Sequence, residues 1–394
     1  MSSFSDQFPQ ATAEFYPEST EQVAAAVQEA RQRSWAIIPW GNGSKLDWGG
    51  QIQSELPLCG ISTSKLNRLI DHAAGDLTVT LETGMTYVRL QEILAQRGQF
   101  LALDPPLAAG ATIGGILATG CNGSWRQRYL GVRDMCLGLT MVRADGEVVK
   151  AGGRVVKNVA GYDLMKLLTG SYGSLGIVTQ VTLRVYPIAA AAQTLMVTGS
   201  LEEILALSQK ILLAPFTPSR LDLVAGSYLR DLGSESEFAL VIEFSGISES
   251  VQFQALALVE LAGKLVVVEA QPQIWQHISD LIWQPGRAIA KVGLLATDFL
   301  AVWPEIRKLA GDGWIQLHGS SGWLSMGDQV SAGQVAEIRQ SLRVRKGWLS
   351  LVRSPLGLKQ ELSDLWGYGP DTAKMMRLLK QKFDPEYLLN PGRV

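Results

Sequence analysis

Glycine is concentrated in one part of the chain, and this constrains the fold more than any other feature. Fourteen of the 67 residues at positions 110–176 are glycine, about 21% against a usual share of roughly 7%. With an earlier run at 39–45, they form four glycine loops, the others being 108–123, 151–164 and 169–179. Because glycine has no Cβ, such loops can turn backbone N–H groups toward one ligand. Any one loop is also typical of a packing turn, but together they predict a site for an extended, phosphate-bearing ligand.

None of these loops has the spacing of a common nucleotide motif. A Walker A loop needs Gly-Lys-Ser/Thr after a four-residue gap, and a dinucleotide fingerprint must open a helix. Gly41-Asn42-Gly43 comes closest, but the following Asp47-Trp48-Gly49-Gly50 does not start a helix. We expect positive φ angles in this first loop, which asparagine also tolerates, and not a Rossmann site.

Charge and composition exclude other classes of protein. The chain has 394 residues with 35 basic and 37 acidic side chains, a formal charge of -2, so we expect no nucleic acid partner, because binding to phosphate backbones needs a basic excess. The 47% of hydrophobic residues can fill a large core, and the length predicts at least two domains.

Cysteine and histidine are too sparse to build a metal centre. Cys59, Cys121 and Cys136 include no C-x-x-C pair, so we expect neither a structural zinc site nor an iron–sulfur cluster in this chain, but reduced thiols in a cytoplasmic protein. The three histidines lack metal-site spacing as well. Any redox chemistry must therefore use an organic cofactor.

The sequence predicts no direct membrane span. The N-terminus lacks the basic and apolar regions of a secretory signal. The longest uncharged stretch, 105–125, contains two prolines and five glycines, which would leave backbone groups unsatisfied in lipid. We expect this stretch to be a buried, irregular loop that faces a ligand.

Periodicity divides the chain into three parts. Residues 1–187 alternate short strands, such as 35–39, with helices, such as 21–33, and contain an Asp-Gly hairpin turn, which predicts an α+β domain. Residues 188–353 contain less glycine and alternate strand-like with helical runs, typical of an antiparallel sheet with helices on one side. Residues 354–394 are a basic helix and a tail rich in Pro and Gly.

Taken together, the motifs resemble a known family. The stretches that carry the resemblance are Pro39-Trp40-Gly41-Asn42-Gly43-Ser44, Ala111-Thr112-Ile113-Gly114-Gly115, Arg133-Asp134, 156–164, 173–179 and the closing Asn390-Pro391-Gly392-Arg393. They resemble the FAD-binding domain of the vanillyl-alcohol oxidase family, also called PCMH-type, and within it FAD-binding subunits of glycolate oxidase (glycolate dehydrogenase). The resemblance covers 17–187 and 380–394 well and the middle of the chain only in outline.

The resemblance implies the architecture and the cofactor. We expect a PCMH-type two-subdomain FAD-binding domain, a ferredoxin-like α+β cap domain, and a tail that returns to the FAD domain. It implies that 40–44 wrap the FAD pyrophosphate, that 112–115 and 118–123 follow the ribityl chain and ring, and that 176–178 lie near the adenine. The implied FAD-binding residues are Trp40, Gly41, Asn42, Gly43, Ser44, Thr112, Gly114, Gly115, Thr119, Cys121, Asn122, Arg126, Lys157, Gly176, Ile177, Val178 and Asn390.

FAD attachment is expected to be non-covalent, because covalent members of the family that this chain resembles use a His or Cys beside the flavin ring, and the first loop here has Asn42 and no His. Cys121 is the one candidate for a covalent or redox role, although a small packing residue is the simpler interpretation. Two residues are catalytic candidates. His318 could act as a general base, since imidazole titrates near working pH, and Arg287 could bind a substrate carboxylate. Each is also compatible with a purely structural role.

The function implied is oxidation of glycolate, or another small 2-hydroxy acid, to glyoxylate by hydride transfer to flavin N5. Because the chain cannot build a cluster relay, we expect an iron–sulfur subunit and a second FAD subunit as partners, and membrane association only through them. Two alternatives remain: a self-sufficient 2-hydroxy-acid dehydrogenase that uses His318 and an arginine, and a non-catalytic assembly subunit.

Overall fold

The computed structural model describes residues 4–153, 161–230, 234, 236–311, 313–327, 329–362 and 364–393. The chain forms two compact units. The first comprises 1–122, 130–188 and 368–394, and the second comprises 123–129 and 189–367. The expected boundaries were 187/188 and 353/354. In the structure, 123–129 also belongs to the second unit, and the segment that returns to the first unit begins at Tyr368.

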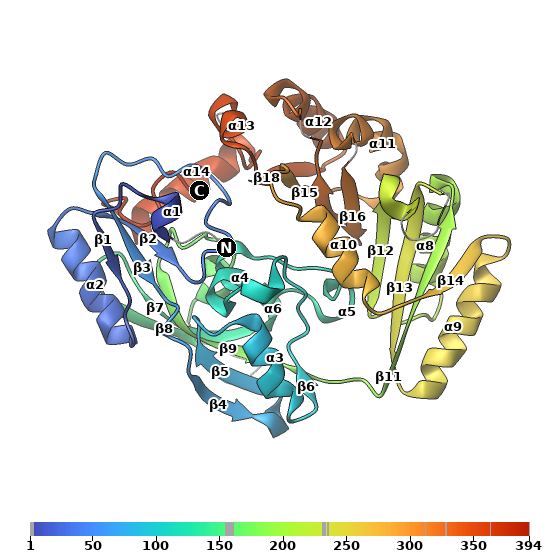
Figure 1. Ribbon diagram of the computed structural model, residues 1–394, viewed down its shortest axis with the longest axis horizontal. Coiled ribbons are helices and arrows are strands. Elements are labelled where there is room, and N and C mark those ends of the chain that lie inside the picture. The colour runs from blue at the N-terminus through green and yellow to red at the C-terminus, as the bar shows by residue number, and fades with distance from the viewer. Residues whose placement is uncertain are drawn as a thin grey trace. The chain divides into compact units, whose positions relative to one another are not determined.

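A small parallel sheet opens the first unit (Figure 1). Its strands follow the order β1 (Ala13–Phe15), β3 (Leu58–Ser62), β2 (Ala36–Trp40). Helix α2 (Thr20–Gln32) begins at Ser19, whose side chain accepts a hydrogen bond from the N–H of Gln22, a normal N-cap. The short helix α1 (Phe4–Gln7) precedes this sheet.

The second sheet of this unit has five antiparallel strands. Their order is β4 (Leu69–Ala73), β5 (Thr78–Glu82), β9 (Ile177–Arg184), β7 (Cys136–Val142), β8 (Val148–Gly152). The expected hairpin is confirmed as β7–β8, with Gly146 at φ 84° in its turn. Val23 and Val27 of α2 share one core cluster with Ile37 of the parallel sheet and Val142 of the antiparallel sheet. Helix α2 therefore joins the two sheets.

Short helices and a strand pair complete the first unit. They are α3 (Tyr87–Ala95), α4 (Ile113–Thr119), α6 (Val132–Met135), α7 (Leu164–Leu168), the 3-10 turns η1 (Ala74–Asp76) and η2 (Ala108–Gly110), and the pair β6 (Gln99–Phe100) and β10 (Tyr186–Pro187).

The expectation of an irregular loop over 105–125 is wrong in its middle, where α4 forms. Thr112 caps this helix by accepting a hydrogen bond from the N–H of Gly115, and Gly120 ends it at φ 61°. Ile113, Ile116 and Leu117 bury its apolar face. Capping at both ends and burial of this face outweigh the low helix propensity of Gly114 and Gly115.

The second unit contains an eight-stranded sheet whose pairs are all antiparallel, as expected. The strand order is β14 (Val266–Ala270), β11 (Ala191–Gly199), β13 (Phe238–Gly246), β12 (Arg220–Ala225), β16 (Trp314–His318), β17 (Ser321–Ser325), β15 (Ile289–Gly293), β18 (Trp348–Arg353). One core cluster joins its inward residues to helices α8 (Leu201–Leu213), α9 (Ser248–Ala262), α11 (Ala296–Ala310), α12 (Ala332–Val344) and α13 (Leu356–Glu361).

The other face of this sheet carries buried polar and charged residues beside apolar ones such as Val224 and Val241. Leu221 and Leu223 face the helices, so the alternating Arg220 and Asp222 lie on the opposite face. Helices α10 (Ile274–Ile282) and α5 (Arg126–Tyr129) pack against β16 and β12 respectively. Trp275 of α10 donates a hydrogen bond to Thr194 on this face, so not all helices lie on one side as expected. The 3-10 turn η3 (Ser227–Arg230) and helix α13 (Leu356–Glu361) complete this unit.

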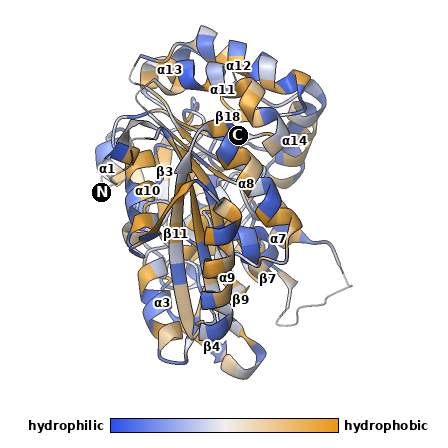
Figure 2. Ribbon diagram, turned by 90° about the vertical axis from the view of Figure 1, so that its right-hand side faces the viewer, coloured by the Kyte–Doolittle hydropathy of each residue, from blue (hydrophilic) through white to orange (hydrophobic). Residues whose placement is uncertain are grey.

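Helix α9 is apolar on more than its core side. Val251 and Leu258 are buried, yet Phe253 and Leu256 are 73% and 72% exposed, and hydrophobic residues are visible along this helix (Figure 2). A surface helix normally has a polar outer face, so this second apolar face needs an explanation.

The C-terminal segment returns to the first unit, with α14 (Pro370–Phe383) followed by a tail. Backbone hydrogen bonds join Ile37 of β2 to Leu388 and Asn390. No helix within the described ranges is long and apolar enough to cross a membrane.

Candidate cofactor site

One pocket in the first unit collects most of the predicted FAD-binding residues. The loop after β2, helix α4 and the C-terminal tail form it. The predicted residues that line it are Trp40, Gly41, Asn42, Gly43, Ser44, Thr112, Gly115, Thr119 and Asn390. Three stretches that are far apart in sequence therefore meet at one site.

Gly41 is needed for close approach and not for an unusual backbone angle. A Cβ at Gly41 would lie 2.4 Å from Thr112 Oγ1, a distance that real structures do not tolerate. Within this loop only Gly43 has a positive φ, 76°. The expectation of positive φ at successive residues is therefore wrong for Gly41 and Asn42. Instead, Gly41 packs directly against the Thr112 side chain at the start of α4.

Asn390 brings the returning tail into the pocket. Its φ of 43° is one that asparagine tolerates. Its Nδ2 donates a hydrogen bond to the Tyr172 carbonyl at 2.6 Å, while its buried Oδ1 has no donor among the described residues. A buried acceptor without a partner is costly, so Asn390 offers the pocket an oxygen that a bound ligand can satisfy.

Two cations also line the pocket, and the sequence analysis did not select them. The Lys45 ammonium lies 3.4 Å from Ser44 Oγ and 5.5 Å from the Trp48 ring centroid. Arg393 donates hydrogen bonds to the carbonyls of Trp48 and Gly50, at 2.6 and 3.1 Å. Their positions in the sequence could have indicated them: Lys45 directly follows Ser44 of the first loop, and Arg393 belongs to the closing motif.

Burial lowers the pKa of both cations. Desolvation lowers the pKa of Lys45 to about 8, against smaller raising effects of Cys121 and Asp47. It lowers the pKa of Arg393 to about 10, against Tyr172 and Asp47. A desolvated cation favours an anionic ligand, so the pocket suits phosphate.

The remaining predicted FAD residues of this unit lie outside the pocket lining. Gly114 packs on Thr83, Cys121 is buried, and Asn122 accepts a hydrogen bond from the N–H of Val132. Gly176 packs against Met141, and Ile177 and Val178 belong to β9. Arg126 is exposed on α5, in the second unit. Lys157 lies outside the described residues.

The two catalytic candidates belong to the second unit. Arg287 donates hydrogen bonds to Gln284 Oε1 and to the Met326 carbonyl, so it supports its own loop. His318 ends β16, and its side chain is not among those described. The register pairs His318 with Asp222 on the neighbouring strand. Asp222 is 96 positions away in the chain, so the local sequence around His318 does not reveal this pairing.

Asp222 belongs to a buried polar network. Its Oδ2 accepts hydrogen bonds from Ser124 Oγ and Gln316 Nε2, at 2.5 and 2.6 Å. Next to it, the Arg220 guanidinium lies between the rings of Trp125 and Trp275, 4.0 and 4.9 Å from their centroids. This network joins 123–129, which directly follows the glycine loop at 108–123, to the second unit's sheet.

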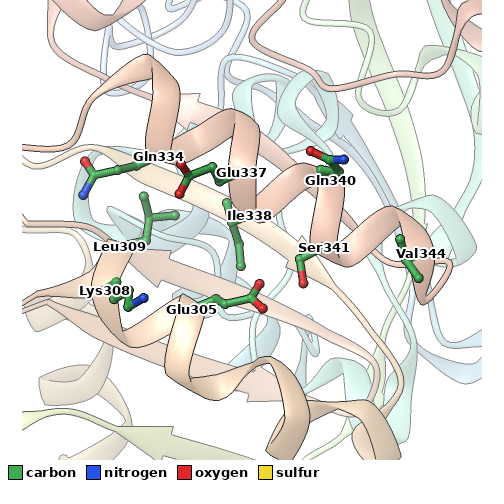
Figure 3. A pocket seen from close by; sticks show the side chains of 9 residues that line it. All are labelled: Glu305, Lys308, Leu309, Gln334, Glu337, Ile338, Gln340, Ser341 and Val344. Carbon is green, nitrogen blue, oxygen red and sulfur yellow. The ribbon is translucent and has the colours of Figure 1, made fainter.

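A second hollow lies between α11 and α12 (Figure 3). Glu305, Glu337 and Ile338 contribute to its lining. It contains none of the predicted site residues, and its two carboxylates outnumber its one lysine, Lys308, so it suits a phosphate-bearing ligand less well than the first pocket does. No group of three His, Cys, Asp or Glu in the part of the chain that the structure describes could hold a metal ion.

The pocket combines a glycine loop, the Asn390 Oδ1 acceptor without a hydrogen-bond donor among the described residues, and the desolvated cations Lys45 and Arg393. This combination suits a nucleotide cofactor. Comparison with known families identifies that cofactor. Residues 11–152 match the FAD binding domain, and residues 363–394 match the C-terminal domain of FAD linked oxidases. The chain therefore carries the two domains of FAD-linked oxidases, with FAD as the cofactor, and its relatives named glycolate oxidase subunit and D-lactate dehydrogenase are oxidoreductases acting on CH–OH groups.

Three relatives show how far the similarity extends. The mitochondrial D-lactate dehydrogenase [cytochrome] of Arabidopsis thaliana is 36% identical over 173 residues, which are 44% of this chain and 30% of that protein. The D-lactate dehydrogenase of Archaeoglobus fulgidus is 27% identical over 96% of this chain and 90% of its own length. Glycolate oxidase subunit GlcE of Escherichia coli is 29% identical over 83% of this chain and 84% of its own length.

The fold also matches solved structures. An alkyldihydroxyacetonephosphate synthase superposes with a TM-score of 0.72 over 96% of this chain and 75% of its own, at 17% identity. At that identity the match supports the α+β fold of this family and no more.

Proposed function

We propose that this chain is an FAD-binding subunit of a dehydrogenase complex that oxidises a small 2-hydroxy acid, with glycolate as the leading candidate. The observation that carries the proposal is the pocket in which the Gly41–Ser44 loop, α4 and Asn390 meet. It lies in a chain whose relatives over more than four fifths of their length are a D-lactate dehydrogenase and a glycolate oxidase subunit. Both names describe oxidation of a 2-hydroxy acid.

Bound FAD would accept the hydride from the Cα of the hydroxy acid. The chain must then remove the hydroxyl proton and hold the carboxylate. We assign proton removal to His318, because imidazole titrates near working pH, and the strand register places its backbone opposite that of Asp222. Arg287 remains the candidate for the carboxylate, although its hydrogen bonds to Gln284 and Met326 favour a supporting role.

We infer that FAD is held without a covalent bond, because the described pocket lining contains no histidine or cysteine. Electrons would leave through an iron–sulfur subunit, alongside a second FAD subunit, in a cytoplasmic complex that reaches a membrane only through its partners. The exposed apolar face of α9, with Phe253 and Leu256, supports a role as a subunit, because such faces commonly mark contact surfaces.

Two alternatives make different predictions. A self-sufficient dehydrogenase would reduce its own flavin with glycolate, whereas an assembly subunit would bind FAD without reacting. The similarity to the D-lactate dehydrogenases, 96% of this chain in one case, favours the first. The similarity to a protein named a glycolate oxidase subunit favours a complex.

The test uses the purified chain under anaerobic conditions. A yellow preparation with a flavin spectrum supports the proposal, and a colourless one that added FAD does not restore contradicts it. Glycolate and D-lactate are then added. Bleaching by the wild type that is lost in His318→Gln, with FAD content unchanged, supports the catalytic assignment. No bleaching by the chain alone, but bleaching after addition of the copurified partners, supports the complex.

A further inference from the structure

Lys45 is the cation of the FAD pocket that donates no hydrogen bond to a backbone carbonyl of the described residues. Its ammonium contacts Ser44 Oγ at 3.4 Å and faces the Trp48 ring, and no carboxylate of the described residues pairs with it. Arg393, by contrast, is occupied by the carbonyls of Trp48 and Gly50. Lys45 can therefore reorient toward a ligand without breaking an ion pair.

The charged and titratable groups around Lys45 come from each element that borders the pocket. Asp47 lies on its own loop, Cys121 follows α4, Tyr172 precedes β9 and Arg393 lies on the tail. Asp47 and Cys121 favour the charged ammonium, but desolvation exceeds their effect. Arg393 adds a like charge. Burial in the pocket therefore disfavours the lysine cation, and binding of an anion there would favour it.

We propose that Lys45 binds the diphosphate of FAD as a charged ammonium, and that above neutral pH FAD binding is coupled to uptake of a proton by Lys45. This inference rests on FAD binding within the proposed function. It adds the residue that binds the diphosphate and the coupling between FAD binding and protonation of that residue. Lys45 is a binding residue in it, and no part of the hydride transfer depends on it.

The sign of the pH effect follows from protonation in the two states. Since burial lowers the pKa of Lys45 to about 8, the ligand-free protein carries the charge at pH 6 to 7 and FAD finds it ready. Above pH 8 the free protein has lost the proton while the complex retains it. The dissociation constant for FAD should therefore rise with pH, by up to about tenfold per pH unit, until Lys45 in the complex also loses its proton.

The experiment measures FAD binding and needs no turnover. Apoprotein of the full chain is titrated with FAD from pH 6 to 10, and flavin fluorescence gives the dissociation constant. Riboflavin, which has the same ring and no phosphate, is titrated in parallel. The variants are Lys45→Met, Lys45→Arg and, as a matched control, Lys150→Met at an exposed lysine of the same unit.

We expect Lys45→Met to weaken FAD binding about 10- to 100-fold at pH 7, to leave riboflavin binding unchanged and to abolish the alkaline rise. Lys45→Arg should bind FAD nearly as well as the wild type at pH 7 and should not weaken up to pH 9.5, because guanidinium keeps its charge. Lys150→Met should behave as the wild type.

Three results would overturn the inference: unchanged FAD affinity in Lys45→Met, equal losses for FAD and riboflavin, or a wild-type affinity that does not depend on pH. If Lys45→Met does not fold, the pH profile of Lys45→Arg against the wild type decides the question. A wild-type apoprotein that binds neither FAD nor riboflavin would instead contradict the proposed function itself.

Discussion

The Ser124 hydroxyl donates a hydrogen bond to the Asp222 carboxylate at 2.5 Å across 98 positions of sequence, with both side chains almost completely buried. Gln316 donates to the same oxygen from the next strand. The segment that follows the glycine loop at 108–123 is therefore attached to the face of the second unit's sheet that carries Asp222. The same face carries the backbone position of His318, opposite Asp222.

The Asp222 network should contribute strongly to the stability of the second unit. Asp222→Ala removes the acceptor that Ser124 Oγ and Gln316 Nε2 share in a buried site and leaves Gln316 only its hydrogen bond to Ser124 Oγ at 3.1 Å, so we expect a loss of about 2–4 kcal/mol in the free energy of unfolding. Asp222→Asn keeps one acceptor and should lose less. Urea unfolding of Ser124→Ala, Asp222→Ala and the double variant tests this, and additive losses would show that the two side chains are not coupled.

Gly41 should be intolerant of any side chain. Because a Cβ would lie 2.4 Å from Thr112 Oγ1, Gly41→Ala must push the loop away from α4, and we expect FAD affinity to fall about tenfold or more. Gly75→Ala is the matched control, since no atom lies within 4 Å of a Cβ there. Fluorescence titration of the two apoproteins compares them. Equal FAD affinity would show that the loop adapts.

The attachment of the C-terminal tail to the first unit should depend on one buried ion pair, between Lys380 and Asp384. Lys380 contacts the fully buried Asp384 at 2.5 Å and donates to the carbonyls of Ser174 and Leu389. Lys380→Met leaves the Asp384 charge without this partner, at an expected cost of about 3–5 kcal/mol. Release of the tail would also displace Asn390 and lower FAD content.

Lys382→Met is the control for this prediction. Lys382 lies two residues further on the same helix and is exposed, so its replacement should change stability by no more than about 0.5 kcal/mol. Thermal unfolding and limited proteolysis of the C-terminus measure both variants. A tail equally resistant in both would contradict the role given to Lys380.

Two cysteines should be unreactive in the folded protein. Desolvation raises the pKa of both Cys59 and Cys136 to about 12. At pH 8 about one molecule in ten thousand would then carry the thiolate that reacts with iodoacetamide. We expect no labelling of either residue in the native protein and full labelling in urea, detected by mass spectrometry of peptides. Rapid native labelling of Cys59 would show that the parallel sheet opens.

Much of the cofactor site could be predicted from local sequence. Gly41-Asn42-Gly43-Ser44, Thr112, Gly115 and Asn390 belong to short motifs that carry the family resemblance, and the resemblance implied that they bind FAD. Helix α4 was missed because the glycines in 108–123 outweighed its Thr112 cap and Gly120 end in the sequence interpretation. The sequence contains both the cap and the end of this helix, but the helix forms because folding also buries Ile113, Ile116 and Leu117.

Lys45 and Arg393 show the limit of such prediction. In the sequence they are ordinary basic residues beside recognised motifs. They become cofactor-site residues because the fold brings a loop near position 45 and a tail near position 393 into one desolvated pocket. Desolvation depends on everything that surrounds a side chain, and most of those neighbours are distant in the chain.

By itself, the sequence determined the α+β class, the antiparallel sheet of the second unit, the glycine loops and, through the resemblance they carry, the FAD family. These properties depend on periodicity and on backbone freedom, which are local. The tertiary structure alone decided that Asp222 pairs with His318, that Ser124 reaches Asp222, and that Lys45 lacks a carboxylate partner among the described residues. Strand register and burial set those relationships, and both arise only when segments about a hundred or more residues apart pack together.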